Sequence, residues 1–315
     1  DRLGIKPLYL WRGSDRAALV SEPKQFGAFH GFSFTAEREQ LADFLVDGFL
    51  GHDPDRCCLK GVRPMRPASR LTWPLGELPD FDRAQIYWQP SRETQPIRLN
   101  EAIERVGYFA GEATRLRLRS DVPIGCCLSG GIDSSTIAGL ASRRYGYALA
   151  TFSSCFDGFE FDEQIYIDAV NRHCRTTMPV KVYPSQQDAI DQLDKLIYHQ
   201  DEPVFGLNQY AHWLVTQAAR QASVPVLLNG QGGDEALCGY RKYAFFYLQQ
   251  LIRGSHPLAA MKHAINCIRA GDSRLFDLRA GSRYLPKWVR SRIDPVNDLL
   301  KPEWRGLDTG TWSRR

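Results

Sequence analysis

Residues 122–135 contain the side chains and the spacing needed to hold an anion. An apolar run ends in Ser129-Gly130-Gly131, and helical spacing begins near Asp133. Glycine lets the backbone come close to a ligand because it has no Cβ. The first amides of a helix lack internal partners, and the helix dipole is positive at that end. The sequence therefore predicts a strand, a glycine turn and a helix start that together bind an anion.

The side chains of this loop favour a nucleotide phosphate. Ser129, Ser134 and Ser135 offer hydroxyl donors to phosphate oxygens, whereas Asp133 would repel phosphate unless Mg²⁺ lies between them. No lysine follows the glycines, so the loop is not a Walker A motif. The string SGGxDSS resembles the PP-loop of ATP pyrophosphatases, which cleave ATP between the α- and β-phosphates and hold the leaving pyrophosphate. A serine-capped helix after a strand is the purely structural alternative.

A second stretch, residues 227–235, has the same design. Its sequence is Leu-Leu-Asn-Gly-Gln-Gly-Gly-Asp-Glu, so an apolar strand ends in glycines and an acidic pair opens a helix. Acidic side chains are favourable at a helix start, so capping alone is an alternative explanation. Beside the first loop, however, this stretch reads as the other wall of one site. We expect Asp133 and Asp234 to hold one Mg²⁺ between them.

Together the two motifs resemble the synthetase domain of asparagine synthetases. That family carries SGGxDSS and later GxGxDE followed by a glycine-tyrosine pair, which is Gly239-Tyr240 here. Three earlier strings, residues 1–9, 21–24 and 60–64, resemble the end of the family's glutaminase domain. The family's cysteine nucleophile lies upstream of these strings. The resemblance thus implies a fragment, and glutamine hydrolysis by this chain is not expected.

The resemblance also implies a role for each motif residue. Leu128 and Ser154 would contact the adenosine, and Asn229 and Gly230 would lie against the nucleotide through their backbone. Pyrophosphate would be held by Ser129, Gly130, Gly131, Ser134 and Ser135. Gln231 and Glu235 would be the catalytic residues. Many family members have glutamate where this chain has Gln231, so the identity of the acceptor carboxylate stays open.

Two further acidic segments match the family pattern. Residues 199–203 resemble a segment that lines the acyl-acceptor pocket, where Asp201 or Glu202 would orient the substrate amine. Asp162-Glu163 resembles a pair in a mobile loop near ATP, and an acidic first helical turn is the alternative for this pair.

The implied reaction is ATP-dependent amide formation. Aspartate would be activated as an acyl-adenylate with release of pyrophosphate, and ammonia from glutamine would then give asparagine. The implied cofactors are ATP and Mg²⁺, and the implied location is the cytoplasm. Two alternatives stay open: a related amidotransferase or cyclase acting on another carboxylate, and a truncated nucleotide-binding module without catalysis. No nucleic acid or membrane partner is expected, and a homodimer is compatible with this interpretation.

The hydrophobic pattern indicates the elements that must position these residues. After the first motif, apolar strands at 149–156, 178–183 and 224–228 alternate with helical stretches at 162–174, 185–200 and 207–222. Such alternation predicts an α/β fold with a doubly wound parallel sheet of the PP-loop ATP pyrophosphatase type. Ligands bind such sheets at the carboxyl ends of the strands, where both motifs lie.

The residues before this sheet suggest a separate part. A hairpin around residues 8–20, a helix at 37–47 and a strand at 69–73 fit the β-rich end of an N-terminal-nucleophile glutaminase domain. The expected domains are 1–74 as the remnant of that domain, 75–100 as a linker that leads to a helix at 101–119, and 101–315 as the synthetase-like domain. Within the last, residues 245–315 read as helical and basic.

Composition fits an ordinary globular protein. The 315 residues are 43% hydrophobic and the net charge is +4, which is too small to argue for nucleic acid. No apolar run reaches the ~20 residues that span a bilayer. The eight cysteines form no CxxC pair, so we expect free thiols in a reducing cytosol.

Overall fold

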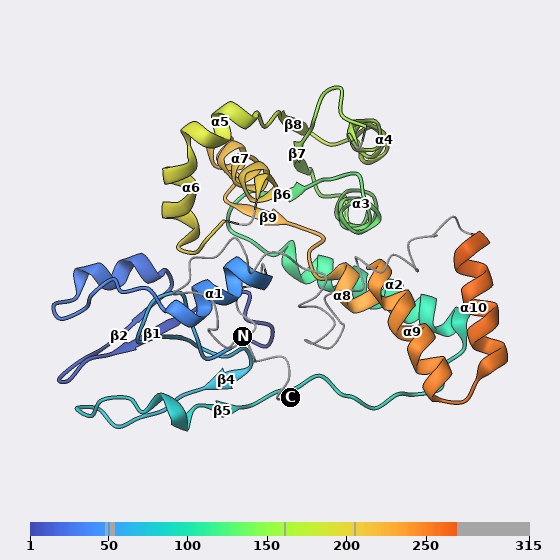
Figure 1. The fold of residues 1–315 in the computed structure, drawn as a ribbon. Coiled ribbons are helices and arrows are strands. Elements are labelled where there is room, and N and C mark those ends of the chain that lie inside the picture. Colours follow the sequence, from blue (N-terminus) through green and yellow to red (C-terminus); the bar gives the residue numbers. More distant parts are fainter. Residues whose placement is uncertain (48–49, 51–53, 161, 205, 270–315) are drawn as a thin grey trace. The chain divides into compact units, whose positions relative to one another are not determined.

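The computed structural model describes residues 1–47, 50, 54–160, 162–204 and 206–269 (Figure 1). These residues divide into two compact units. The first contains Asp1–Ile97 and Gln186–Tyr210, and the second contains Arg98–Ser185 and the described residues from Ala211 onward. Each unit has its own hydrophobic core.

The first unit is built on a small antiparallel sheet. Strand β1 (Tyr9–Arg12) pairs with β2 (Ala17–Val20), which confirms the predicted hairpin, and its other edge pairs with β3 (Val62–Pro64). A 3₁₀ helix (Pro23–Ala28) and helix α1 (Arg38–Asp47) follow the hairpin. Trp11, Phe26 and Val62 meet in the core of this unit.

A second pair of strands extends into the stretch expected to be a linker. Strand β4 (Ser69–Arg70) is shorter than predicted and pairs antiparallel with β5 (Gln85–Ile86). A 3₁₀ turn, Phe81–Arg83, precedes β5. At least this part of residues 75–100 therefore has regular structure.

The second unit contains a four-stranded parallel sheet, as predicted. Its strands are β6 (Ile124–Cys127), β7 (Ala150–Ser154), β8 (Met178–Val182) and β9 (Val226–Leu228). They lie in the order β8-β7-β6-β9. The chain thus adds β7 and β8 on one side of β6 and then returns to place β9 on the other side. The reversal of strand order falls between β6 and β9, the strands that lead into the two glycine motifs.

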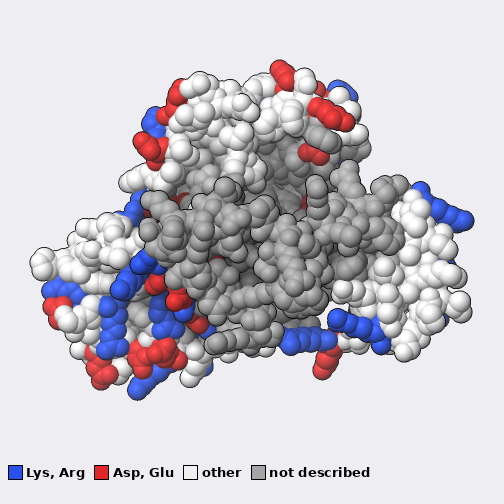
Figure 2. All heavy atoms as spheres, viewed as in Figure 1, with Lys and Arg blue, Asp and Glu red and all other residues white. Residues whose placement is uncertain are grey.

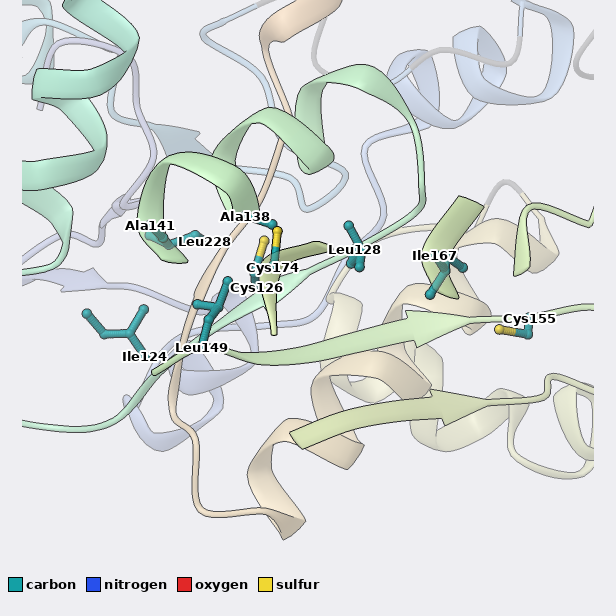
Figure 3. Packing of buried hydrophobic residues seen from close by; sticks show 10 residues of the cluster. All are labelled: Ile124, Cys126, Leu128, Ala138, Ala141, Leu149, Cys155, Ile167, Cys174 and Leu228. Atoms are coloured by element: carbon teal, nitrogen blue, oxygen red, sulfur yellow. The ribbon is translucent and has the colours of Figure 1, made fainter. Parts of the chain in front are cut away.

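Helices cover both faces of this sheet. Helices α3 (Ile132–Gly139) and α4 (Gln164–Cys174) pack on one face, where Ala138 and Ile167 join a cluster of buried strand residues (Figure 3). Helix α7 (Leu207–Gln221) packs on the other face through Val215 and Ala219, which meet Phe152 of β7. Side chains alternate along a strand, so β7 serves both cores.

The predicted single helix over 185–200 is wrong, because the chain forms two helices there. Helix α5 (Gln186–Asp191) and helix α6 (Leu193–Gln200) are separated by Gln192, whose ψ of 8° leaves the helical region. The Gln192 side chain donates a hydrogen bond of 3.0 Å to the Tyr210 hydroxyl. A polar residue held by a distant partner therefore accompanies the break.

The remaining helices belong to the second unit. Helix α2 (Leu99–Arg117) leads into β6 and confirms the predicted helix. Helices α8 (Gly233–Leu237), α9 (Arg241–Arg253) and α10 (Pro257–Arg269) follow β9. The rest of the stretch read as helical, residues 270–315, lies outside the described residues. Among the helices that are described, none has both the length and the apolar character needed to cross a membrane.

Surface charges of both signs lie close together over the first unit. Figure 2 shows Lys and Arg beside Asp and Glu in the region of β1, β2, β4 and β5. Arg63 pairs there with Asp82 at 2.7 Å, and Arg66 pairs with Asp55. Exposed pairs of this kind contribute ~0–1 kcal/mol each.

The cysteines are free thiols, as predicted. Several lie in the cores, and burial raises the pKa of the Cys126 thiol to about 12 and that of Cys127 to about 11. Thiols with such pKa values stay protonated at neutral pH and behave as small hydrophobic groups.

Candidate nucleotide-binding site

The loop of residues 129–135 is held by its own serines. The Ser129 amide donates to the Ser134 hydroxyl at 3.2 Å, and the two hydroxyls lie 3.1 Å apart. The Gly131 amide donates to the Ser129 hydroxyl at 3.3 Å. Helix α3 starts directly after Gly131, and no side chain of the described residues caps it. The first amides of α3 therefore remain available to an anion at the carboxyl end of β6.

Gly130 has to be glycine in this loop. Its φ is +83°, and a Cβ there would lie 2.8 Å from the Tyr166 Cβ and 3.3 Å from the Glu163 carbonyl oxygen. The loop thus lies against the start of α4, whose first turn follows the Asp162-Glu163 pair. Asp162 accepts a hydrogen bond from the Phe156 amide at 3.1 Å, which ties this acid into the turn after β7.

The loop of residues 229–235 lies directly against the first loop. A Cβ on Gly230 would come within 2.8 Å of the Asp133 Cβ and 2.9 Å of the Ser134 nitrogen. A Cβ on Gly233 would come within 2.4 Å of an Asp133 carboxylate oxygen. Both glycines therefore leave the room that Asp133 occupies. The two sequence motifs meet at Asp133, which the pattern alone had led us to expect.

The acidic pair of the second loop lies beside the glycines that pack on Asp133. Asp234 follows Gly233 and so lies next to the glycine that packs on Asp133. The Asn229 side chain accepts from the Gln231 amide at 3.2 Å, while Gln231 itself is exposed. Within the described part of the chain, no three His, Cys, Asp or Glu side chains are grouped to hold a metal ion. A Mg²⁺ held by Asp133 and Asp234 needs phosphate and water as further ligands, and it stays a prediction.

Three buried hydroxyls near the strand ends have no hydrogen-bond partner within the part of the chain that the structure describes. They are the hydroxyls of Ser135, Ser153 and Ser154. A buried polar group without a partner costs stability, so folded proteins rarely keep one unless a ligand or water completes it. Ser135 and Ser154 were both predicted to contact the nucleotide. Their unfilled hydrogen-bonding capacity fits ATP at this position.

Leu128 differs from the other predicted site residues. Its side chain is 1% exposed and lies in the core beside Ile167 (Figure 3). Its amide donates to the Phe152 carbonyl at 3.0 Å. The side chain of Leu128 is therefore core, and a contact of its backbone with a nucleotide stays a prediction.

Two further residues of this region, Ser153 and Tyr240, were not among the predicted site residues. Ser153 lies on the α4 face of β7 and has an unpartnered hydroxyl. Tyr240 donates to the Glu235 carboxylate at 2.9 Å. A serine inside an apolar strand was the available signal for the first. The glycine-tyrosine pair was the signal for the second, although its contact could not be read from spacing.

The segment that resembled an acyl-acceptor wall has other contacts in the structure. Asp201 lies within the first unit and pairs with Lys24 at 3.0 Å, and Lys24 also pairs with Glu22. Burial and the neighbouring Asp201 raise the pKa of Glu202. Burial raises the pKa of Tyr9 and of Cys58, and the nearby charge of Glu202 raises both pKa values further.

We expect Glu202→Gln to stabilise the protein in a pH-dependent way. A carboxyl whose folded pKa is raised binds its proton more tightly in the folded state, so folding stability falls as pH rises from the ordinary glutamate value of about 4.3 through the raised pKa. The glutamine variant lacks this loss. Its free energy of unfolding should match that of wild type near pH 4 and exceed it at neutral pH, as measured by urea unfolding across the range. Glu77→Gln, at an exposed position of the same unit, is the control. A gap that does not grow with pH would contradict the assignment.

Comparison with known proteins identifies the family. Residues 110–306 match the family model described as asparagine synthase. The chain therefore belongs to the asparagine synthase family. It is 30% identical to a putative glutamine-hydrolysing asparagine synthetase 2 of Methanocaldococcus jannaschii, over 80% of this chain and 48% of that protein.

Other relatives carry more than one functional name. A glutamine-hydrolysing asparagine synthetase 1 of Bacillus subtilis is 27% identical over 77% of this chain and 37% of its own length. A protein of Penicillium rubens named amidase chyE is 27% identical over 76% of this chain and 37% of its own length. In each case the chain spans about half or less of the relative.

Proposed function

We propose that the protein catalyses ATP-dependent amide formation, with aspartate activated as an acyl-adenylate and then aminated by ammonia from glutamine. The observation that carries this proposal is the packing of Asp133 against Gly230 and Gly233, which joins the two glycine loops into one site. The strand order, with its reversal beside β6, supports a doubly wound sheet of the PP-loop type. Membership of the asparagine synthase family supports the type of reaction.

In this proposal each loop has a defined task. The starting amides of α3 and the hydroxyls of Ser129, Ser134 and Ser135 bind the β- and γ-phosphates. Charge builds on these phosphates as the aspartate carboxylate attacks the α-phosphorus, and fixed donors stabilise it. Asp133 and Asp234 would hold Mg²⁺, which neutralises part of this charge when bound. Gly130, Gly131, Asn229 and Gly230 offer backbone to the nucleotide, and Ser154 and the Leu128 backbone face the adenosine.

The proposal extends to the rest of the chain. Residues 1–74 would be the end of a glutaminase domain, residues 75–100 its connection, and residues 101–315 the synthetase part. Gln231 and Glu235 would face the acyl group. The site would act on ATP and a small carboxylate in the cytoplasm.

Exchange of labelled pyrophosphate into ATP tests the activation step. The full-length protein should catalyse the exchange with Mg²⁺ and aspartate and should not do so when the carboxylate is left out. If no carboxylate supports exchange, the proposed activity is wrong, and the protein would be a module that binds nucleotide without catalysis. Calorimetry with Mg²⁺-ATP would show that outcome directly.

A related amidotransferase with another acceptor is the second candidate. The observation that favours it is Gln231, a neutral and exposed side chain at the position expected to face the acyl group. The fungal relative named amidase shows that similar proteins carry other functional names. Exchange that depends on a carboxylic acid other than aspartate would select this candidate.

Ser135→Ala and Ser154→Ala should weaken ATP binding without loss of stability. Each variant removes a buried hydroxyl that has no hydrogen-bond partner among the described residues, so the free energy of unfolding should stay equal or rise by up to about 1 kcal/mol. Loss of one hydrogen bond to ATP should raise Kd about five- to tenfold. Calorimetry and urea unfolding measure the two effects. Ser142→Ala removes a hydroxyl that donates to Ala138 at 2.7 Å and should leave ATP binding unchanged.

A further inference from the structure

The acidic pair of the second loop stands on an element too short to fix it. Helix α8 has five residues, and Asp234 and Glu235 lie in its first turn. Helices of this length are marginal without outside contacts. The chain then reverses at Cys238, whose φ of 58° is left-handed and unusual for a residue with a side chain. The reversal brings the next two residues back onto the pair.

Gly239 and Tyr240 contact one acid each. The Gly239 amide donates to the Asp234 carbonyl at 2.9 Å, and a Cβ on Gly239 would meet the Asp234 carboxylate at 1.9 Å. Only glycine leaves room for that carboxylate. The Tyr240 hydroxyl donates to Glu235 Oε1 at 2.9 Å, and this bond raises the pKa of Tyr240. The phenol therefore keeps its proton and remains a donor at neutral pH.

Tyr240 stands at the start of a longer helix than the one that carries Glu235. Tyr240 caps the start of α9, which has thirteen residues, and its carbonyl accepts from the Tyr243 amide at 2.9 Å. Its ring lies 6.0 Å from that of Tyr243. Aromatic rings have few rotatable bonds, whereas a glutamate side chain loses considerable freedom when it is held. The better-anchored group thus orients the more mobile one.

We propose that Tyr240 is a positioning residue that holds the Glu235 carboxylate toward the acyl group, while Gly239 clears the space in which the Asp234 carboxylate lies. The inference rests on the proposed function, because Glu235 matters only if the loop serves the activated acyl group. Beyond that function, it assigns to residues 238–240 the task of holding Asp234 and Glu235 in place. Misplacing a group in an active site by about 1 Å can cost up to about 100-fold in rate.

The hydrogen bond can be tested without reference to activity. In full-length protein labelled with ¹³C at tyrosine Cζ, the Tyr240 resonance is the one that disappears in Tyr240→Phe. It should titrate at higher pH than free tyrosine, and Glu235→Gln should lower its midpoint. A midpoint that does not respond to Glu235→Gln would overturn the inference.

The kinetic test separates the effect of Tyr240 on kcat from its effect on the KM for ATP. Tyr240→Phe keeps the ring and removes one donor, so pyrophosphate exchange should fall about tenfold in kcat with the KM for ATP unchanged. Glu235→Gln should lower kcat further, and the double variant should be no slower than Glu235→Gln alone, because the hydroxyl acts only through that carboxylate. Tyr247→Phe, which keeps its ring contact with His263 at 5.0 Å, should have wild-type kinetics.

The other outcomes overturn the inference in distinguishable ways. If the two single effects multiply in the double variant, or if KM and unfolding midpoint change with kcat, Tyr240 is only structural. If wild type exchanges normally and Tyr240→Phe matches it, the inference fails and the proposed function stands. If wild type catalyses no exchange while the tyrosine titration still shows the bond, the proposed function fails and the positioning role fails with it.

Discussion

Asp133→Asn is expected to lower pyrophosphate exchange about 100- to 1,000-fold while the protein stays folded. Asp133 lies in the first turn of α3, and its carboxylate fills the space that Gly233 leaves. Asparagine has nearly the same shape, so the packing against both glycines is retained. The substitution removes one negative charge from the two carboxylates, Asp133 and Asp234, that are predicted to bind Mg²⁺. Losing several kcal/mol of transition-state stabilisation corresponds to a fall of about 100- to 1,000-fold in rate. The exchange assay at saturating Mg²⁺-ATP measures this loss.

The control separates the metal role from a general charge effect. Asp121→Asn removes an exposed acid just before β6 and should leave the exchange rate unchanged. Raising Mg²⁺ should rescue Asp133→Asn partly if the site is weakened and not destroyed. Asp133→Asn with wild-type exchange would refute a ligand role for Asp133, and the second loop would then need another explanation for its glycines.

Much of the second unit was predictable because its signals are local. Apolar runs bounded by glycine and polar turns marked β6, β7, β8 and β9. Helical spacing marked α2, α4 and α7 to within a few residues. The meeting of the two loops followed from a general rule, since the carboxyl ends of parallel strands share one edge of the sheet. That β9 pairs with β6 was not readable, because alternation of strands and helices does not set their order in the sheet.

The misses share a physical cause, which is dependence on a distant partner. Gln192 breaks a helix that its neighbours favour, and its side chain is bonded to Tyr210, eighteen residues further on. Lys24 pairs with Asp201, which lies 177 residues further on, and this contact could not be read from the sequence, whereas a role of Asp201 or Glu202 in binding the acceptor stays a prediction. The Tyr240–Glu235 bond depends on the left-handed turn at Cys238, a conformation that a cysteine rarely adopts. Local patterns cannot report such contacts.

Gly230→Ala is expected to damage both stability and activity. A methyl group there would lie 2.9 Å from the Ser134 nitrogen and 3.2 Å from the Asp133 carbonyl carbon, and such backbone atoms cannot step aside as a side chain can. The second loop would have to move away from the start of α3. Overpacking of this kind costs about 1–3 kcal/mol, and displacement of the site should lower exchange about 100-fold or more. Urea unfolding and pyrophosphate exchange measure the two losses.

Two matched glycine variants decide whether the cause is contact between the loops. The three atoms nearest to a methyl group on Gly233 all belong to the Asp133 side chain, so Gly233→Ala should lower exchange by pushing the carboxylate aside while costing less stability than Gly230→Ala. Gly139 lies in α3, and among the described residues no atom outside its own stretch of helix lies within 4 Å of where a Cβ would stand. Gly139→Ala should therefore keep full exchange and gain up to about 1 kcal/mol of stability from helix propensity. If Gly230→Ala behaved like Gly139→Ala, the two loops would not touch in solution and the single site built on Asp133 would be wrong. The graded order Gly139, Gly233, Gly230 in lost stability is the result that the packing of Asp133 requires.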